Sequence, residues 1–238
     1  MQVISFAHLK GGVAKTTSAL MMAFALKQMG YRVALVDLDL SGQLTQTLQG
    51  SKQAGMPIQT VQDWQQAKQT LMGGVDFYPT PFGGDQLEMA LPSDDKLFGL
   101  YRQLEQHYDF CLLDCPSGFF PWRQAVLHLS HWQMVPTLLS PLMRSTSITY
   151  LMRMAKTAIA QKQTLKVFLL PVMYNKYQRS HHIGLESLKR LVGEQRVLSP
   201  IRQDRHLENL VTTHSWQALS QSGAYRDYQQ IVAKLFSG

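Results

Sequence analysis

The first thirty residues place a loop of small residues between a β-rich run and a helical run. Gln2 to His8 (QVISFAH) has the composition of a strand, and Thr16 to Met29 has the Ala, Leu and Met content of a helix that ends at Gly30. The loop at residues 9–17 reads LKGGVAKTT. Small residues let backbone N–H groups converge on an anion, and the helix N-terminus, a lysine and a hydroxyl complete a cradle for phosphates and Mg²⁺. The sequence therefore predicts a phosphate-binding loop.

The same alternation of strand and helix continues along the chain. Further strands are predicted at Arg32–Leu38, Val75–Tyr78, Phe110–Cys115, Gln133–Leu139 and Lys166–Val172, and further helices at Thr60–Leu71, Asp94–His107, Trp122–Leu129, Ser145–Gln161, His181–Val192 and Ala224–Leu235. This order predicts an α/β fold with a doubly wound, mostly parallel sheet and helices on both faces. The loop-like stretches at 51–57 and 79–84 have strand-like segments on both sides, so residues 1–238 are expected to form a single domain.

Composition excludes several other classes of protein. Of the 238 residues, 45% are hydrophobic, which is enough for a packed core and excludes a disordered or collagen-like chain. The sequence has no apolar run of about 18 residues and no signal peptide, so a cytoplasmic protein is expected. Cys111 and Cys115 lie on one predicted strand about 13 Å apart, which predicts two reduced thiols in a core. The net charge of +7 favours polyanionic partners.

The loop departs from the general phosphate-binding pattern, which requires glycine where Leu9 and Ala14 stand. Its residues are instead similar to the deviant Walker A loop of the ParA/MinD family, which has a lysine, two glycines, two variable residues, a second lysine and then Thr or Ser. The matching residues are Lys10, Gly11, Gly12, Lys15 and Thr16. The resemblance implies a P-loop NTPase-like fold that binds ATP through Lys10, Gly11, Gly12, Val13, Ala14, Lys15, Thr16 and Thr17. It gives Lys10 and Lys15 catalytic roles on the phosphates and Thr16 a role on Mg²⁺.

Two acidic motifs follow strands whose carboxyl ends face the loop. Asp37 and Asp39 end the second strand, and Asp114 lies at the end of the apolar run FCLLDCP at residues 110–116. These motifs also resemble those of the ParA/MinD family. The resemblance implies that Asp37 and Asp114 support the Mg²⁺ ion and that Asp39 orients the attacking water. The sequence differs from the family after Asp39, where Leu40 and Ser41 replace the common Pro and Gln.

The later part of the chain carries weaker signals. Asn175 follows a predicted strand where relatives place an asparagine against adenine, and residues 200–219 are similar to the late adenine-side loop and helix of the family. Five basic residues cluster in sequence in the last third of the chain and are candidates for DNA binding because relatives use a comparable region: Lys189, Arg190, Arg196, Arg202 and Arg205. A solvated surface explains these five residues equally well.

The resemblance as a whole implies a small ParA-like ATPase. Such proteins form an ATP-dependent homodimer, bind DNA without sequence preference, associate with the nucleoid, and hydrolyse ATP when a small adaptor or centromere-binding partner stimulates them. The cycle positions a plasmid, a chromosome or a protein assembly.

Two alternatives remain at this point. A MinD-like membrane switch would use the tail at residues 231–238 as an interfacial helix, although this tail has one lysine and its apolar residues suit core packing equally well. A metabolic P-loop enzyme would transfer phosphate to a small molecule, and Lys10 argues against it.

Overall fold

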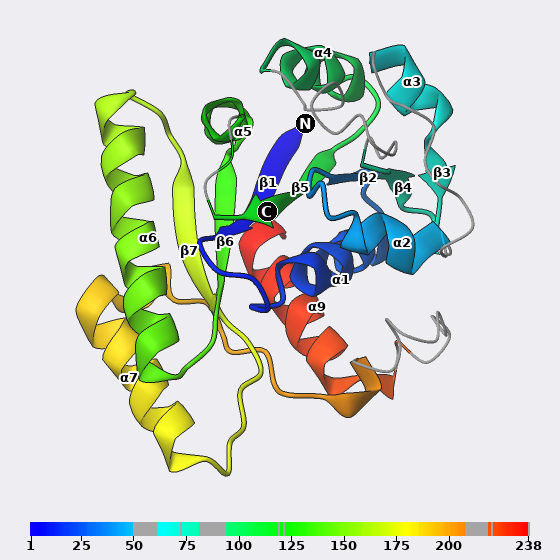
Figure 1. Cartoon of the computed structure of the whole chain (residues 1–238). Coiled ribbons are helices and arrows are strands. Elements are labelled where there is room, and N and C mark those ends of the chain that lie inside the picture. The colour runs from blue at the N-terminus through cyan, green and yellow to red at the C-terminus, as the bar shows by residue number, and fades with distance from the viewer. Residues whose placement is uncertain are drawn as a thin grey trace.

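A seven-stranded sheet runs through the middle of the molecule, with helices on both of its faces (Figure 1). The computed structural model describes residues 1–49, 61–71, 73–80, 94–118, 120, 122–207, 219 and 221–237. The strands are β1 (Gln2–His8), β2 (Val33–Asp37), β3 (Gln69–Thr70), β4 (Asp76–Tyr78), β5 (Phe110–Ser117), β6 (Trp132–Thr137) and β7 (Lys166–Pro171). The helices are α1 (Lys15–Gln28), α2 (Gln43–Gln49), α3 (Val61–Gln66), α4 (Asp94–Leu104), α5 (Arg123–Leu129), α6 (Pro141–Ala160), α7 (Arg179–Val192), the 3₁₀ turn η1 (Glu194–Arg196) and α9 (Gly223–Phe236).

The strands lie in the order β3-β4-β2-β5-β1-β6-β7, and β3 alone runs antiparallel to its neighbour. The other neighbouring pairs are parallel, so the prediction of a doubly wound, mostly parallel sheet is confirmed. All parallel strands therefore end at the same edge, the lower end of the sheet in Figure 1. Ligands of open α/β sheets bind beyond this edge.

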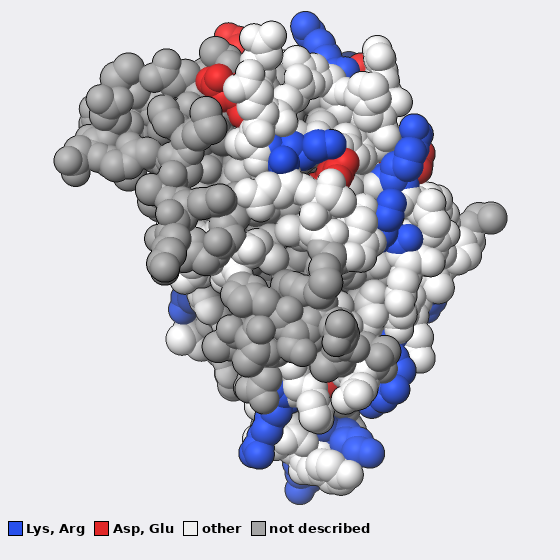
Figure 2. All heavy atoms as spheres, turned by 90° about the vertical axis from the view of Figure 1, so that its right-hand side faces the viewer, with Lys and Arg blue, Asp and Glu red and all other residues white. Residues whose placement is uncertain are grey.

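Ion pairs between neighbouring elements lie at the β3 side of the sheet. Arg32 pairs with Asp109 and Lys68 pairs with Asp76, at 2.8 and 3.1 Å. Figure 2 shows this side of the molecule, where basic and acidic side chains lie next to one another in the upper half. Charges in this upper half therefore largely cancel.

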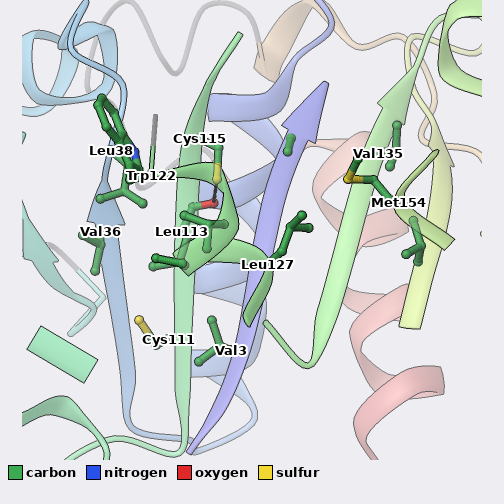
Figure 3. Close-up of a cluster of buried hydrophobic side chains, with 14 of the residues drawn as sticks. Val3, Val36, Leu38, Cys111, Leu113, Cys115, Trp122, Leu127, Val135 and Met154 are labelled. Atoms are coloured by element: carbon green, nitrogen blue, oxygen red, sulfur yellow. Dashed lines mark hydrogen bonds between the residues drawn. The ribbon is translucent and has the colours of Figure 1, made fainter. Parts of the chain in front are cut away.

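Two hydrophobic clusters hold the helices to the two faces of the sheet. Side chains that alternate along the strands, such as Val3 on one face and Ile4 on the other, divide the core between them. The first cluster packs α4, α5, α6 and α7 onto one face, and Figure 3 shows Trp122, which directly precedes α5, and Leu127 from α5 over the strands there. The second cluster packs α1 and α9 onto the other face.

Most predicted elements are confirmed, with three differences. The helix expected at Thr60–Leu71 ends at Gln66, because Gln69 and Thr70 turn to pair with β4. The helix expected from Ser145 begins at Pro141, where proline suits the first helical turn. Helix α2 was not predicted, since its residues QLTQTLQ show no clear apolar period. The stretch 51–57, most of 79–84 and most of 200–219 lie outside the described residues.

Both cysteines are buried free thiols, as predicted, and burial raises the pKa of Cys111 to about 12. Among the described helices, none combines the length and the apolar character that crossing a bilayer requires.

Candidate phosphate-binding site

The predicted phosphate-binding loop turns sharply between β1 and α1. Gly12 has a φ of +70°, and Ala14 has φ 61° and ψ 34°, so both residues adopt the left-handed conformation. This conformation directs successive backbone N–H groups to one side, which is the geometry of an anion-binding nest. Helix α1 begins directly afterwards at Lys15, and its first turn has no acidic residue. The N-terminus of α1 therefore favours an anion at the loop.

Lys15 connects the loop to the segment that follows β5. Its side chain is buried, and its ammonium donates a hydrogen bond to the Ser117 hydroxyl at 2.6 Å. The Gly118 N–H donates to the carbonyl of His8 at 3.1 Å, so this segment lies directly against the start of the loop. Nothing in the sequence pointed to Ser117, because 102 residues separate it from Lys15.

Asp114 and Asp37 lie side by side at the carboxyl edge, since they are register partners on β5 and β2. Both side chains are completely buried. Burial raises the pKa of Asp114 well above its usual value, and the negative charge of Asp37 raises it further, while the Thr16 hydroxyl and the Lys15 ammonium act in the opposite direction. Although the Thr16 hydroxyl lies close enough to favour the charged form, neither oxygen of Asp114 has a partner in normal hydrogen-bond geometry among the residues that the structure describes. A carboxylate in this state lacks a polar or cationic ligand.

Both oxygens of Asp37, in contrast, accept hydrogen bonds from other residues of the chain. Its Oδ2 accepts hydrogen bonds from the backbone N–H and the hydroxyl of Thr45 at 3.0 and 2.7 Å, and its Oδ1 accepts from the Asp39 N–H at 3.0 Å. Burial raises the pKa of Asp37 to about 7, although these hydrogen bonds favour the ionised form. Asp37 therefore orients α2 and Asp39, and Asp114 is the carboxylate that remains open to a ligand.

Asp39 lies half-exposed in the turn that leads into α2. Its Oδ1 accepts the Ser41 N–H at 2.9 Å, and its carbonyl accepts the Gly42 N–H at 2.8 Å. The turn fixes the side chain at the same edge of the sheet as the phosphate-binding loop.

Lys10 is anchored through its backbone by a histidine that the sequence analysis did not single out. The Lys10 N–H donates to His8 Nδ1 at 3.0 Å, so the ring proton resides on Nε2, which lies 2.9 Å from the Ser147 hydroxyl on α6. Burial lowers the pKa of His8 and keeps the ring neutral. His8 thus links the start of the loop to α6.

An apolar cavity of about 270 Å³ adjoins the loop. Ala14 and Thr17 line one side, Met173 and Ile201 line another, and Tyr228 from α9 also contributes. Asn175 does not line this cavity. It lies in a neighbouring hollow of about 610 Å³, where its side-chain oxygen accepts the Tyr177 N–H at 2.9 Å.

The five basic residues that are close in sequence do not form one cluster. Lys189 and Arg190 lie in the last turn of α7, and Arg196 lies in η1, directly before Val197, which pairs with Leu169 in the middle of β7. Arg202 and Arg205 line the 610 Å³ hollow at the carboxyl edge, and Arg202 pairs with Asp227 at 2.6 Å. Lys189 pairs with Glu186 at 3.1 Å. Only Arg202 and Arg205 therefore lie on the side of the predicted phosphate-binding loop.

A parallel sheet with a glycine-containing loop between β1 and α1, a buried lysine and a buried acid on the adjacent strand defines a P-loop NTPase fold. A sequence model described as an AAA domain matches residues 1–167. The chain belongs to this family, and within it to the ParA/MinD group of deviant Walker A ATPases.

Individual relatives agree with this assignment. The chain is 32% identical to the chromosome-partitioning ATPase Soj of Thermus thermophilus over 135 residues, which cover 56% of this chain and 53% of Soj. The matched segment thus spans about half the length of Soj, and the same holds for Soj of Bacillus subtilis, at 50%. MinD of Pyrococcus horikoshii, solved with Mg-ADP, superposes with a TM-score of 0.80 at 19% identity over 99% of this chain and 96% of MinD. An ATP complex of McdA from Cyanothece superposes with a TM-score of 0.76 at 16% identity over 99% and 96% of the two chains.

Proposed function

We propose that this chain is a ParA-like ATPase whose ATP-bound homodimer binds DNA without sequence preference, and whose hydrolysis is stimulated by a partner protein to partition or position a cargo. The observation that carries the proposal is the buried, unpartnered carboxylate of Asp114 beside the loop in which Gly12 and Ala14 adopt the left-handed conformation. This combination suits a nucleoside triphosphate with a divalent cation.

The residues present fit a hydrated Mg²⁺ ion. The described residues contain no cluster of three His, Cys, Asp or Glu side chains, so a cation here would retain water and phosphate ligands, as Mg²⁺ does. Thr16 and Asp114 would hold it, and Asp37 would support the site through α2 and Asp39. When bound, Mg²⁺ supplies neutralisation of charge on the phosphates.

The loop residues bind ATP through two kinds of group, backbone N–H groups and the Lys15 ammonium. Gly11, Gly12, Val13, Ala14 and Thr17 offer backbone N–H groups to the phosphates. Lys15 exchanges its hydrogen bond with Ser117 for one with the terminal phosphates, where it offsets negative charge.

The cavity beside Ala14 and Thr17 has the apolar walls that a base requires. Asn175 then acts from the adjacent hollow, as a residue that shapes the rim of the base site.

One acidic and one basic residue at the rim of the site, Asp39 and Lys10, act on the reaction. Asp39, held by its turn, orients the attacking water. Lys10 lies before the paired glycines, so Lys15 is the lysine placed to grip phosphate within its own subunit. Lys10 therefore serves the nucleotide of a second subunit across a sandwich dimer, where two triphosphates would otherwise repel each other.

DNA binding is best placed at the carboxyl edge of the sheet. The 610 Å³ hollow there is lined by Lys176, Arg202 and Arg205 together with Tyr174 and Tyr177, and it contains one acid, Asp227. Figure 2 shows basic side chains at this lower end of the molecule. Basic and aromatic side chains suit phosphate and base contacts. Lys189, Arg190 and Arg196 lie elsewhere and contribute long-range attraction only.

The packing of α9 argues against the membrane alternative. The apolar side chains that a membrane anchor would use are buried in the core: Tyr225, Tyr228, Ile231 and Val232. Phe236 contacts the rings of Phe110 and Trp132 at centroid distances of 4.9 and 5.0 Å. An interfacial helix would have to break these contacts.

Two substitutions test the proposed nucleotide cycle. Lys10→Ala should bind ATP as a monomer but lose ATP-dependent dimerisation, DNA binding and stimulated hydrolysis, as measured by calorimetry and light scattering. Asp39→Ala should bind ATP, dimerise and remain on DNA with hydrolysis lost. Lys15→Ala, which should lose ATP affinity, is the control for the loop itself. A stable ATP-dependent Lys10→Ala dimer would contradict the sandwich arrangement.

Cosedimentation with ATP separates the DNA and membrane alternatives. Wild-type protein should sediment with duplex DNA of unrelated sequences equally, should not sediment with phosphatidylglycerol vesicles, and log K should fall linearly with log salt by about 0.9 per phosphate neutralised. Arg205→Ala should reduce this slope, whereas Arg190→Ala should not. Binding that is independent of salt would count against the proposal.

A further inference from the structure

The net positive charge of the chain arises from one continuous segment of the sequence. Residues 115–185 contain eight Lys or Arg residues and no Asp or Glu, whereas the rest of the chain has 15 Lys or Arg and 16 Asp or Glu. The segment therefore accounts for the whole net charge of +7. It comprises α5, β6, α6, β7 and the first turns of α7, which lie together on the left of Figure 1. This side of the molecule therefore has an excess of basic side chains, bordered by Glu186 on α7 and by Asp94 and Asp95 on α4, and the side seen in Figure 2 is mixed.

Helix α6 presents an unusually apolar face to solvent on this basic side. Leu142, Met152 and Ile159 are 66%, 51% and 78% exposed. At about 100° per residue these three side chains fall within roughly a third of the helix circumference, and Arg153 and Lys156 lie on the same stripe. All five are accessible along a length of about 25 Å. We call Leu142, Met152, Arg153, Lys156 and Ile159 the α6 stripe.

A recess of about 390 Å³ lies beside the second half of the α6 stripe. Arg123 from α5 and Arg153 and Lys156 from α6 line it, and Thr157 and Gln161 provide polar groups. The Gln161 side-chain amide donates to Gln124 on α5 at 3.1 Å and joins the two helices here. The recess therefore combines a concave shape with three basic side chains.

We propose that the α6 stripe and its recess dock an acidic, amphipathic helix of a partner protein. The charge of the surface favours an acidic partner, because residues 115–185 supply eight Lys or Arg side chains and no Asp or Glu. The three exposed apolar side chains select a protein helix with an apolar face, read at positions i, i+3, i+4 and i+7. A recess favours a partner that inserts side chains into it, which neither a flat lipid surface nor a DNA backbone does. About 17 residues of partner helix match the length of the stripe.

This surface is separate from the proposed DNA-binding hollow and does not rest on the proposed function. The recess lies beside the last turns of α6, and these turns are near the amino ends of the strands, because α6 runs from the carboxyl edge back along the sheet. Docking on it therefore requires neither ATP nor DNA.

The test measures binding of a synthetic helical peptide of about 20 residues with leucines on one face and glutamates on the others. Fluorescence anisotropy without nucleotide, in roughly 50 mM salt, should give a Kd of about 10–100 µM that weakens with added salt. The double variant Lys156→Glu/Ile159→Ser should weaken binding at least about tenfold. Amide chemical shifts on peptide addition should change on α5 and α6.

A matched control removes one exposed apolar and one exposed basic side chain from the opposite face of the sheet. Met29→Ser/Lys234→Glu, at the C-terminal cap of α1 and on α9, should bind the peptide as the wild type does. A peptide with lysines in place of the glutamates should not bind. Absence of saturable binding by the glutamate peptide, or equal binding by both double variants, would overturn the proposal.

Two further outcomes would assign the stripe to another ligand. Selective loss of duplex DNA binding, or of phosphatidylglycerol vesicle binding, in the Lys156→Glu/Ile159→Ser variant would show that a polyanion or a lipid surface occupies the stripe, and would also overturn the proposal. Binding of ATP should be unchanged in this variant, so its failure is distinguishable from failure of the nucleotide site.

Discussion

At the scale of single residues, the phosphate-binding loop contains one strained position. Ala14 adopts φ 61°, a left-handed conformation that costs an L-residue with a Cβ about 1–2 kcal/mol. Glycine occupies this conformation without that cost. The general phosphate-binding pattern has glycine at this position, and the left-handed conformation is the physical reason.

Ala14→Gly should therefore stabilise the protein. Removing the backbone strain of the folded state contributes more free energy than the extra conformational entropy of glycine in the unfolded chain costs. We therefore expect the free energy of unfolding to rise by about 1 kcal/mol and the melting temperature by about 2–4 °C, measured by thermal unfolding. The control Ala233→Gly, on an exposed position inside α9, should lose about 0.5–1 kcal/mol. Destabilisation by Ala14→Gly would mean that the Cβ makes contacts worth more than the strain.

The buried carboxyl of Asp114 lowers the stability of the folded protein and remains available to a ligand. An acid whose pKa is raised on folding keeps its proton at pH values where the unfolded chain has released it. The contribution of Asp114 to stability is therefore fully present below the unfolded pKa of about 4 and is lost as the pH rises toward the raised pKa of the folded state. At pH 8 the unfolded chain carries Asp114 ionised while burial in the folded chain opposes that charge, so this carboxyl lowers the stability of the protein without ligand.

Asp114→Asn should consequently be more stable than the wild type at pH 8 without Mg²⁺ or ATP, by about 1–3 kcal/mol. The difference should shrink toward pH 4, where the wild-type carboxyl is protonated. Thermal unfolding over this pH range measures it. Addition of ATP and Mg²⁺ should raise the melting temperature of the wild type and have little effect on the variant. Equal stability at pH 8 would contradict the view that the buried charge lacks a partner.

At the scale of elements, α2 is the short helix that organises the acidic end of β2. Thr45 in α2 donates its hydroxyl to Asp37 at 2.7 Å, and the same oxygen accepts the Thr80 N–H at 3.0 Å from beyond β4. One buried hydroxyl therefore joins α2 to the ends of two strands. The sequence showed the acid of this pair but not the helix that orients it.

Thr45→Val keeps the shape of the side chain and removes both hydrogen bonds. It should cost about 2–3 kcal/mol in the free energy of unfolding, because a buried carboxylate and a buried N–H each lose a partner. Thr45→Ser retains the hydroxyl and should cost about 1 kcal/mol for the lost methyl group. Urea unfolding of the two variants compares them. A valine variant as stable as the serine variant would show that the hydroxyl does not hold α2 in place.

At the scale of the whole molecule, the distribution of charge differs from what the total suggests. The net charge of +7 and the basic residues in the last third of the chain predict a DNA-binding cluster at residues 189–205. In the folded chain these residues divide between the two ends of α7, and two of them form ion pairs with Glu186 and Asp227. The basic side of the molecule is instead formed by α5 and α6, which contain no acids.

The sequence by itself determined the fold class and the main parts of the nucleotide site. Strand and helix periodicity, the loop at residues 9–17, and the acids Asp37, Asp39 and Asp114 are local patterns, so they can be identified without knowing where the chain goes next. The parallel order of β2, β5 and β1 then brings the acids to the loop.

Tertiary structure alone decided which distant residues meet at that edge. Ser117 on Lys15, Ser147 on His8 and Tyr228 beside Ala14 join positions separated by a hundred residues or more. It also decided that Asn175 lies in the hollow next to the apolar cavity and that the α6 stripe shares a side with Arg123. No periodicity encodes such contacts, because they depend on how whole helices pack against a sheet and on which side chains that packing leaves at the surface.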